Sequence, residues 1–393
     1  MIFSRKKVTI LVILWLFLSS LIIASIYRFF NPEVNLLVLK DVFIIAFFIL
    51  LIADYRSLKL YTINHYVVFL VLYLILQSFL SNAPFFAKLA SLRQMLVPFL
   101  LIYIGMSSKI GTFEFVKFKR GIIKIAIFVV LFGYYEIIFS IWHEFELKNY
   151  FEAKNVPVYG DPKETFYNYP PFFIEPIFGG VKRMTATLLD PINLGHTLVF
   201  ILSLILFDKT LGYNRDKKLV LVVFFGTALI LTFSKGALLH VILVALFNFR
   251  KISIGIKVMV MFLFTLLLFY MSNFHQGIKI HLSGIENAIK SLKIFGHGIA
   301  KTGNQATMFF EQTVDIGDTF IGSIMGQIGF LGLVLWLIPF YIIYQKIKDN
   351  IVAKILLAQL IISIISENAF NLLSVFLICI SVGVMYRLNN ING

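Results

Sequence analysis

The sequence predicts an all-α protein that crosses a membrane about twelve times. Hydrophobic residues make up 59% of its 393 residues and charged residues only 14%, a balance that would leave a water-soluble protein with large exposed apolar patches. Apolar runs of about 20 residues, the length of a membrane-spanning helix, recur along nearly the whole chain. No separate soluble module is evident, so we expect residues 1–393 to form a single transmembrane domain.

Each expected helix is an apolar run that ends at charged residues, glycine or proline. The first run, Val8 to Tyr27, follows three basic residues and resembles a signal peptide. Its length and the lack of a small-residue cleavage site favour a retained helix. The expected helices lie near 8–27, 37–52, 60–80, 92–106, 121–142, 191–207, 219–233, 237–249, 254–271, 319–344, 351–365 and 370–386.

The distribution of charge predicts that both termini are cytoplasmic. With the N-terminus inside, the cytoplasmic segments and the helix turns that border them hold 21 of the 35 basic residues and five of the 20 acidic ones, so they carry +16 and the remainder −1. This asymmetry is what the positive-inside rule describes. The basic residues are scattered over seven short turns and do not form one patch with aromatic partners, so we do not expect nucleic-acid binding.

Two segments on the outer side are too long to be turns, and we expect them to form the roof of an active site. They cover about 143–190 and about 272–318. Paired prolines in the first, at 170 and 171, prevent a regular helix. The aromatic residues around them are suited either to stacking on sugar rings or to anchoring a lid at the membrane surface.

The sharpest local pattern lies in residues 181–196. Arg183 stands just outside the bilayer there, and its guanidinium can bind phosphate oxygens in a bidentate way; the alternative is an arginine that reaches lipid headgroups. Asp190 and Pro191 are typical of a helix start, because Asp caps free N–H groups and Pro needs none. Asn193 follows in the first turn.

A second pattern, LTFSKGA, lies at residues 231–237 in a tight outer turn between two helices. Lys235 is the only charge in that hairpin and can face a lipid-linked phosphate or anchor to headgroups. Ser234 precedes it, and Gly236 lets a backbone approach closely.

Two more patterns follow in the second outer segment and the helix after it. Residues 296–298 read Gly-His-Gly, and Asp318 and Thr319 open a helix with glycines at 326, 329 and 332. The glycines near His297 are misplaced for a nucleotide-binding loop.

In this order, these patterns resemble the O-antigen polymerase and ligase superfamily, over roughly residues 90–386. The family commonly has Arg where this chain has Lys235, which keeps the charge but loses the guanidinium fork. Its ligases usually have His where this chain has Asp318 and Thr319, so the resemblance is greatest to repeat-unit polymerases.

The resemblance implies a GT-C-like fold and a metal-independent glycosyltransferase of the bacterial inner membrane. On the outer face, such an enzyme moves a glycan from undecaprenyl diphosphate to the non-reducing end of another lipid-linked repeat unit, for O-antigen or capsular polysaccharide. It also implies a co-polymerase that regulates chain length, and no cofactor. Two alternatives stay open: a ligase that moves the glycan to another acceptor, and a transporter or flippase of lipid-linked glycans.

Fixed cations aimed at the diphosphate would stabilise its developing charge, so Arg183 and then Lys235 are the first catalytic candidates. Asp318, Glu367 and His297 are candidates for a base on the acceptor hydroxyl. Simple solvent exposure at a turn is the alternative for Glu367, and His297 can be an ordinary loop histidine. Arg93, at the outer end of a helix, can hold the acceptor's diphosphate or a headgroup. The expected substrate-binding residues are Arg93, Asp190, Asn193, Ser234, Gly236 and Thr319.

The outer segments contain no His and Glu pairing and no acidic cluster typical of a metal site. Cys379 is the only cysteine, so the chain has neither an intramolecular disulfide nor a thiolate cluster. We therefore expect no metal and no redox chemistry.

Overall fold

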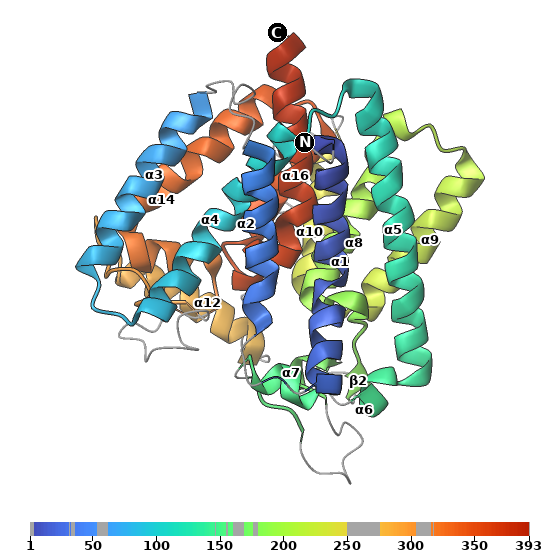
Figure 1. Ribbon diagram of the computed structural model, residues 1–393, viewed down its shortest axis with the longest axis horizontal. Helices are drawn as coiled ribbons and strands as arrows, with labels where there is room; N and C mark the ends of the chain where they lie inside the picture. Colours follow the sequence, from blue (N-terminus) through green and yellow to red (C-terminus); the bar gives the residue numbers. More distant parts are fainter. Residues whose placement is uncertain are drawn as a thin grey trace. The chain divides into compact units, whose positions relative to one another are not determined.

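The computed structural model describes residues 4–30, 32, 36–52, 62–145, 147–154, 156–159, 169–175, 180–249, 276–303, 316 and 318–392 (Figure 1). Nearly all elements of this part of the chain are helices. Six are long and apolar enough to cross a membrane: α1 (Arg5–Phe30), α3 (Thr62–Leu80), α4 (Phe85–Ser107), α5 (Thr112–Phe139), α14 (Phe320–Ile347) and α16 (Leu372–Asn392). Three shorter apolar helices are α8 (Pro191–Phe207), α10 (Lys235–Asn248) and α15 (Ile351–Ile362). The protein is therefore an all-α, multi-pass membrane protein.

Every expected helix that falls on described residues has a helical counterpart. The largest differences are at the starts of α5 and α4, which begin at Thr112 and Phe85 instead of at 121 and 92, because both helices continue through charged residues that interrupt the apolar run in the sequence. The helix expected at 254–271 lies outside the described residues. Twelve crossings and the orientation of the termini stay predictions. The two remaining counterparts are α2 (Leu39–Ile52) and α9 (Arg215–Leu231).

The chain divides into two compact units. Unit 1 consists of Met1–Leu58, Ile102–Leu238 and Leu373–Leu388, and unit 2 of Lys59–Leu101, Leu239–Leu372 and Asn389–Gly393. Neither unit is one continuous stretch, so no linker or shift of composition marks the division in the sequence. The single transmembrane domain stays a prediction.

In unit 1, α16 packs closely against α4 and α8. A Cβ built on Gly383 would lie 2.0 Å from the carbonyl oxygen of Ile102, so the backbones of α16 and α4 are in direct contact. The Ser374 hydroxyl of α16 donates to the side-chain oxygen of Asn193 in α8 at 2.7 Å. Small residues and hydrogen bonds between helices are typical of packing in lipid, where burial of apolar surface gives little driving force.

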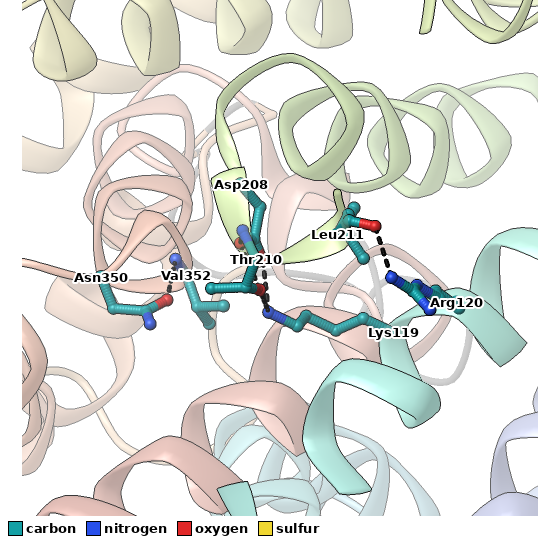
Figure 2. Close-up of polar contacts among 7 residues, drawn as sticks. All are labelled: Lys119, Arg120, Asp208, Thr210, Leu211, Asn350 and Val352. Carbon is teal, nitrogen blue, oxygen red and sulfur yellow. Dashed lines mark hydrogen bonds and ion pairs between the residues drawn. The ribbon is translucent and has the colours of Figure 1, made fainter. Parts of the chain in front are cut away.

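The first turns of α5 are tied to the chain that follows α8 (Figure 2). The Lys119 ammonium contacts the carboxylate of Asp208 and lies 2.9 Å from the hydroxyl oxygen of Thr210. Arg120 donates to the carbonyl oxygen of Leu211 at 2.7 Å. The Lys119 and Asp208 side chains are only 4% and 6% exposed, so removing one partner would leave the other charge buried and unpaired.

Short elements between α5 and α8 form an aromatic layer in unit 1. They are α6 (Ile141–Phe145), α7 (Lys148–Glu152), the 3-10 turn η3 (Pro171–Phe173), the antiparallel strands β1 (Ile174–Glu175) and β2 (Val181–Lys182), and the 3-10 turn η5 (Ala186–Leu188). Their apolar side chains pack against Ile23 and Tyr27 of α1. The buried rings of this layer belong to Trp142, Tyr150, Phe151, Tyr169 and Phe173.

Unit 2 is built around α14, which packs along α3 and also contacts α15. α14 also contacts α12 (Gln276–Lys290) and the 3-10 turn η7 (Glu367–Phe370). In α14, the indole N–H of Trp336 donates to the carbonyl oxygen of Met95 in α4 at 3.0 Å.

The regular helix of α14 is interrupted at Gly329, whose φ of 71° and ψ of −174° are accessible to glycine. The chain that follows α12 fills the interruption. The His297 N–H donates to the carbonyl oxygen of Gly326 at 2.8 Å, and the Phe330 N–H donates to that of Lys293 at 3.0 Å. Irregular backbone is tolerated at membrane depth only where protein or water satisfies it, and here protein does so.

Candidate functional site

Arg183 joins two segments of unit 1 that are far apart in the sequence. Its Nε donates to the carbonyl oxygen of Thr232 at 2.8 Å, and its terminal nitrogens donate to those of Phe172 at 3.2 Å and Phe233 at 3.5 Å. Its backbone N–H donates to the carbonyl oxygen of Phe173 at 2.7 Å. Three of the five guanidinium N–H groups are thus used within the described part of the chain. Arg183 holds the turn after α9 against the β1–β2 hairpin.

Lys235 opens α10 next to the turn that Arg183 holds. Its Nζ lies 3.4 Å from a carboxylate oxygen of Glu175, and the two side chains are 57% and 5% exposed. A long contact of an exposed lysine stabilises a fold little, so this ammonium is accessible to other anions. Ser234 is buried, and its hydroxyl accepts the N–H of Ala237 at 3.4 Å. Gly236 lies in the first turn of α10.

Glu136, near the end of α5, anchors the chain that follows Arg183. One carboxyl oxygen accepts the Ala186 N–H at 2.7 Å, and the other accepts the Thr185 hydroxyl at 2.8 Å. The Thr185 hydroxyl oxygen in turn accepts the indole N–H of Trp142 at 3.1 Å. All these groups are buried. The carboxyl group therefore caps η5 and fixes the point at which the chain leaves Arg183.

Asp190 caps the N-terminus of α8, which is one of the two roles that its position beside Pro191 suggests. Its carboxylate accepts the N–H groups of Ile192 at 2.8 Å and Asn193 at 3.0 Å. Asn193 is buried and connects α8 to α16 through its side chain. These two residues shape the helix entry beside Arg183.

The charges of this cluster influence one another. Burial lowers the pKa of Arg183, and the nearby carboxylates of Asp190 and Glu175 act in the opposite direction. Burial raises the pKa of Asp190, which the N–H of Asn193 and the positive charges of Lys154 and Arg183 partly offset. Electrostatic interactions are stronger in such partly dehydrated surroundings than in water.

Unit 2 contains a cleft beside Arg93. Its open space of about 290 Å³ includes solvent at its mouth, and its enclosed part, about 10 Å³ for the centre of a water molecule, has room for about one water. One cation and three side-chain amides line it, and these groups are suited to binding phosphate or hydroxyl oxygens. The lining residues are Arg93, Gln94, Val97, Asn368, Phe370, Asn371 and Leu372.

Glu367 is a buried acid next to this cleft. Its carboxylate accepts the side-chain N–H of Gln94 at 3.2 Å, and its backbone N–H donates to a carboxylate oxygen of Asp318 at 3.1 Å. Glu367 is only 2% exposed, so simple exposure at a turn does not describe it. Thr319 caps α14, and its hydroxyl accepts the Gly322 N–H at 3.2 Å.

His297 has a different environment in unit 2. Its Nε2 lies 2.8 Å from the carbonyl oxygen of Ser291, and its backbone N–H contributes to filling the interruption in α14. Both contacts stabilise the chain between α12 and α14.

The structure therefore divides the predicted site residues into two groups. The group in unit 1 lies around the turn after α9 and the entry of α8. The group in unit 2 lies around the cleft and the ends of α14. The first contains Arg183, Asp190, Asn193, Ser234, Lys235 and Gly236, and the second contains Arg93, His297, Asp318, Thr319 and Glu367.

Two aromatic side chains of the first long segment are not available for stacking on sugars. Tyr169 and Phe173 are 2% and 1% exposed and belong to the buried aromatic layer of unit 1. They support the hairpin whose second strand ends just before Arg183.

Sequence reasoning missed Glu136, Glu175 and Gln94. Glu136 had a usable signal, because a lone acid inside an apolar helix needs a specific partner. Glu175 and Gln94 had none, since their partners are distant in the sequence.

No group of three His, Cys, Asp or Glu side chains that could hold a metal ion occurs among the described residues. In comparisons with known proteins, no family model and no curated protein matches the chain.

Proposed function

We propose that the protein is a repeat-unit polymerase that transfers a glycan from undecaprenyl diphosphate to another lipid-linked repeat unit on the outer face of a bacterial inner membrane. The product is an O-antigen or capsular polysaccharide. The proposal assigns diphosphate binding to the Arg183 cluster and binding of the acceptor to the Arg93 cleft.

The observation that carries the proposal is the meeting of two sequence motifs in unit 1. Arg183 of the first motif donates to the backbone of Thr232 and Phe233 in the second. Lys235, which follows in that second motif, lies near Glu175 of the same hairpin. Two patterns that resemble one family thus form one cationic cluster. If Arg183 and Lys235 only anchored the protein to lipid headgroups, there would be no reason for the two motifs to contact each other.

The chemistry that this cluster suits is departure of a diphosphate. When the bond between the sugar C1 and the diphosphate oxygen breaks, negative charge builds on that oxygen, and a fixed cation stabilises the transition state more than the ground state. Lys235 is the accessible cation. Arg183 retains two N–H groups beyond its backbone contacts within the described residues, and it also positions Lys235.

Unit 2 supplies the groups that we assign to the acceptor. Arg93 faces the cleft with three amides, a set that can bind a second anionic headgroup. Asp318 holds the backbone of Glu367, so Asp318 is a positioning residue and Glu367 becomes the first candidate for the base. His297 stays the weakest candidate, because its ring contacts the backbone of Ser291.

The transporter alternative gains no support from α14. In transporters, interrupted helices bind ions or substrates through the backbone groups that the interruption frees. In this protein, the N–H and carbonyl groups beside Gly329 contact the chain at 293–298. Nothing specific favours the ligase alternative.

The experiment that tests the proposal is glycan length on gels, in a deletion strain complemented with wild type, Arg183→Ala, Arg183→Lys or Lys235→Ala. Lys235→Ala removes an exposed charge and should leave the fold intact. Arg120→Ala is the matched control, because Arg120 also donates to a backbone carbonyl in unit 1. Protein levels in membranes are measured for every variant.

We expect single capped units from Lys235→Ala and Arg183→Ala, a partial ladder from Arg183→Lys, and a full ladder from the control. Wild-type ladders from both alanine variants at normal protein levels would refute the proposal. Polymer that accumulates uncapped on its carrier would indicate a ligase, and units trapped inside the cell would indicate a flippase.

A further inference from the structure

A second group of cations lies near Arg183 in unit 1. In α2, the Lys40 ammonium donates to the hydroxyl of Ser20 in α1 at 2.7 Å. After α7, the Lys154 ammonium lies over the ring of Tyr150, 4.2 Å from its centroid. α1 contacts both α2 and α7, so these three elements bring two lysines and a tyrosine to one place.

The Tyr150 hydroxyl is the unusual member of this group. Tyr150 is only 1% exposed, and its hydroxyl has no hydrogen-bond partner within the described residues. Lys154 and Ser20 lie near it but do not reach it with hydrogen-bond geometry. A buried hydroxyl without a partner is unfavourable, and such groups commonly face a ligand or ordered water.

The surroundings of Tyr150 carry a positive potential. Burial raises the pKa of its hydroxyl, but the charges of Lys154 and Lys40, together with the nearby polar groups of Lys154 and Ser20, lower the pKa to about 8. A place that stabilises a phenolate in this way also stabilises a phosphate oxygen. The half-buried lysines are therefore arranged for an anion.

This group is continuous with the Arg183 cluster. Asp190 interacts with the charges of both Lys154 and Arg183, and Arg183 also interacts with Glu175, the partner of Lys235. The six charged side chains that form this series are four cations and two carboxylates, a net charge of +2. They are Lys40, Lys154, Asp190, Arg183, Glu175 and Lys235.

A diphosphate that is esterified at both ends carries two negative charges, one on each phosphate, and so matches the net charge of the series. We propose that Lys40, Lys154 and the Tyr150 hydroxyl bind one phosphate group of a lipid-linked diphosphate, beside the group that Arg183 and Lys235 bind. The identity of this ligand rests on the proposed function. The two lysines supply charge as point contacts, and the hydroxyl donates a hydrogen bond to a phosphate oxygen.

The test is binding of farnesyl diphosphate, a short isoprenyl diphosphate, to the purified full chain in detergent. The variants are Lys40→Ala, Lys154→Ala and Tyr150→Phe, and the last keeps the ring that packs in the aromatic layer. Lys148→Ala is the matched control, because Lys148 is exposed on the neighbouring α7 and forms only a surface pair with Glu152. Heat-induced unfolding of each variant checks the fold.

We expect the dissociation constant to rise about tenfold for each lysine variant and about threefold for Tyr150→Phe, with no change for Lys148→Ala. Equal affinity of wild type and both lysine variants would overturn the inference. If a lysine variant unfolds early, Lys40→Arg or Lys154→Arg replaces it, and these should retain most of the affinity.

Inorganic diphosphate is the second probe, and it identifies the source of the phosphate. Lysine-dependent binding of farnesyl diphosphate alone indicates a lipid headgroup, and lysine-dependent binding of both probes indicates recognition of the phosphates themselves. The proposed polymerase is tested separately by glycan ladders. If the ladders are normal in the Arg183 variants while Lys40→Ala loses affinity, the anion site stands and the polymerase does not.

Discussion

Replacing Glu136 by alanine should destabilise unit 1 through the loss of buried hydrogen bonds. The carboxyl group accepts the N–H of Ala186 at 2.7 Å and the hydroxyl and N–H of Thr185 at 2.8 and 3.3 Å. Thr185 and Ala186 are both fully buried. Each buried donor left without a partner costs about 1–3 kcal/mol, so the two N–H groups together cost about 2–6 kcal/mol. Glu136→Gln keeps one acceptor oxygen and should cost about half as much.

Heat-induced unfolding in detergent, followed by tryptophan fluorescence, measures this loss, and Trp142 lies within the affected network. Glu136→Ala should lower the unfolding midpoint by at least about 4 °C. Glu152→Ala is a control in the same unit, because Glu152 is an exposed acid that forms a surface pair with Lys148 and its removal should change the midpoint little. Equal midpoints for wild type and Glu136→Ala would show that this carboxyl group does not hold the turn.

Three further results are expected. Gly329→Ala should prevent folding of unit 2, because its Cβ would lie 2.3 Å from the backbone nitrogen of Gly296. The control Gly226→Ala should fold as wild type does, because its Cβ would have nothing within 4 Å. The yield of monodisperse protein measures the difference, and equal yields of the two variants would contradict the geometry at Gly329. Gly383→Ala should lower the yield of monodisperse protein, because its Cβ would force α16 away from α4. A wild-type yield would mean that α16 and α4 do not need this close contact. Tyr150 should ionise near pH 8, seen as phenolate absorbance that Tyr150→Phe lacks, and bound diphosphate should raise that midpoint. Because this pKa lies below the ordinary value of 10.0, the contribution of Tyr150 to the free energy of unfolding should grow as pH rises from 8 to 10 and vanish below 8. An ionisation midpoint of Tyr150 near pH 10 would contradict the positive potential around its hydroxyl.

The sequence predicted the helices well because each is a long apolar run with clear ends. The starts of α4 and α5 were the exceptions, since charged residues such as Lys88 and Lys119 are compatible with a helix but interrupt the apolar run. The hairpin of β1 and β2 was not predicted, because two-residue strands have no periodicity to recognise.

The candidate site was predictable only in part. Arg183 and Lys235 could be named from their motifs, but their meeting depends on a contact across distant segments. The interpretation of Glu367 changed most, from a residue that exposure at a turn could explain to a buried carboxylate. Lys154 and Tyr150 could not be recognised, because only the packing of α7 on α1 gives the tyrosine its buried hydroxyl.

The place of α16 in unit 1 has a consequence for biogenesis. Its partners in α4 and α8 are synthesised long before it, so until α16 is inserted Ile102 and Asn193 face lipid or assembly factors instead of α16. Unit 1 can close only after α16 has been inserted. A ribosome that stalls before Leu372 would therefore leave a membrane-inserted but unfinished unit, and quality-control proteases could recognise its open helix faces.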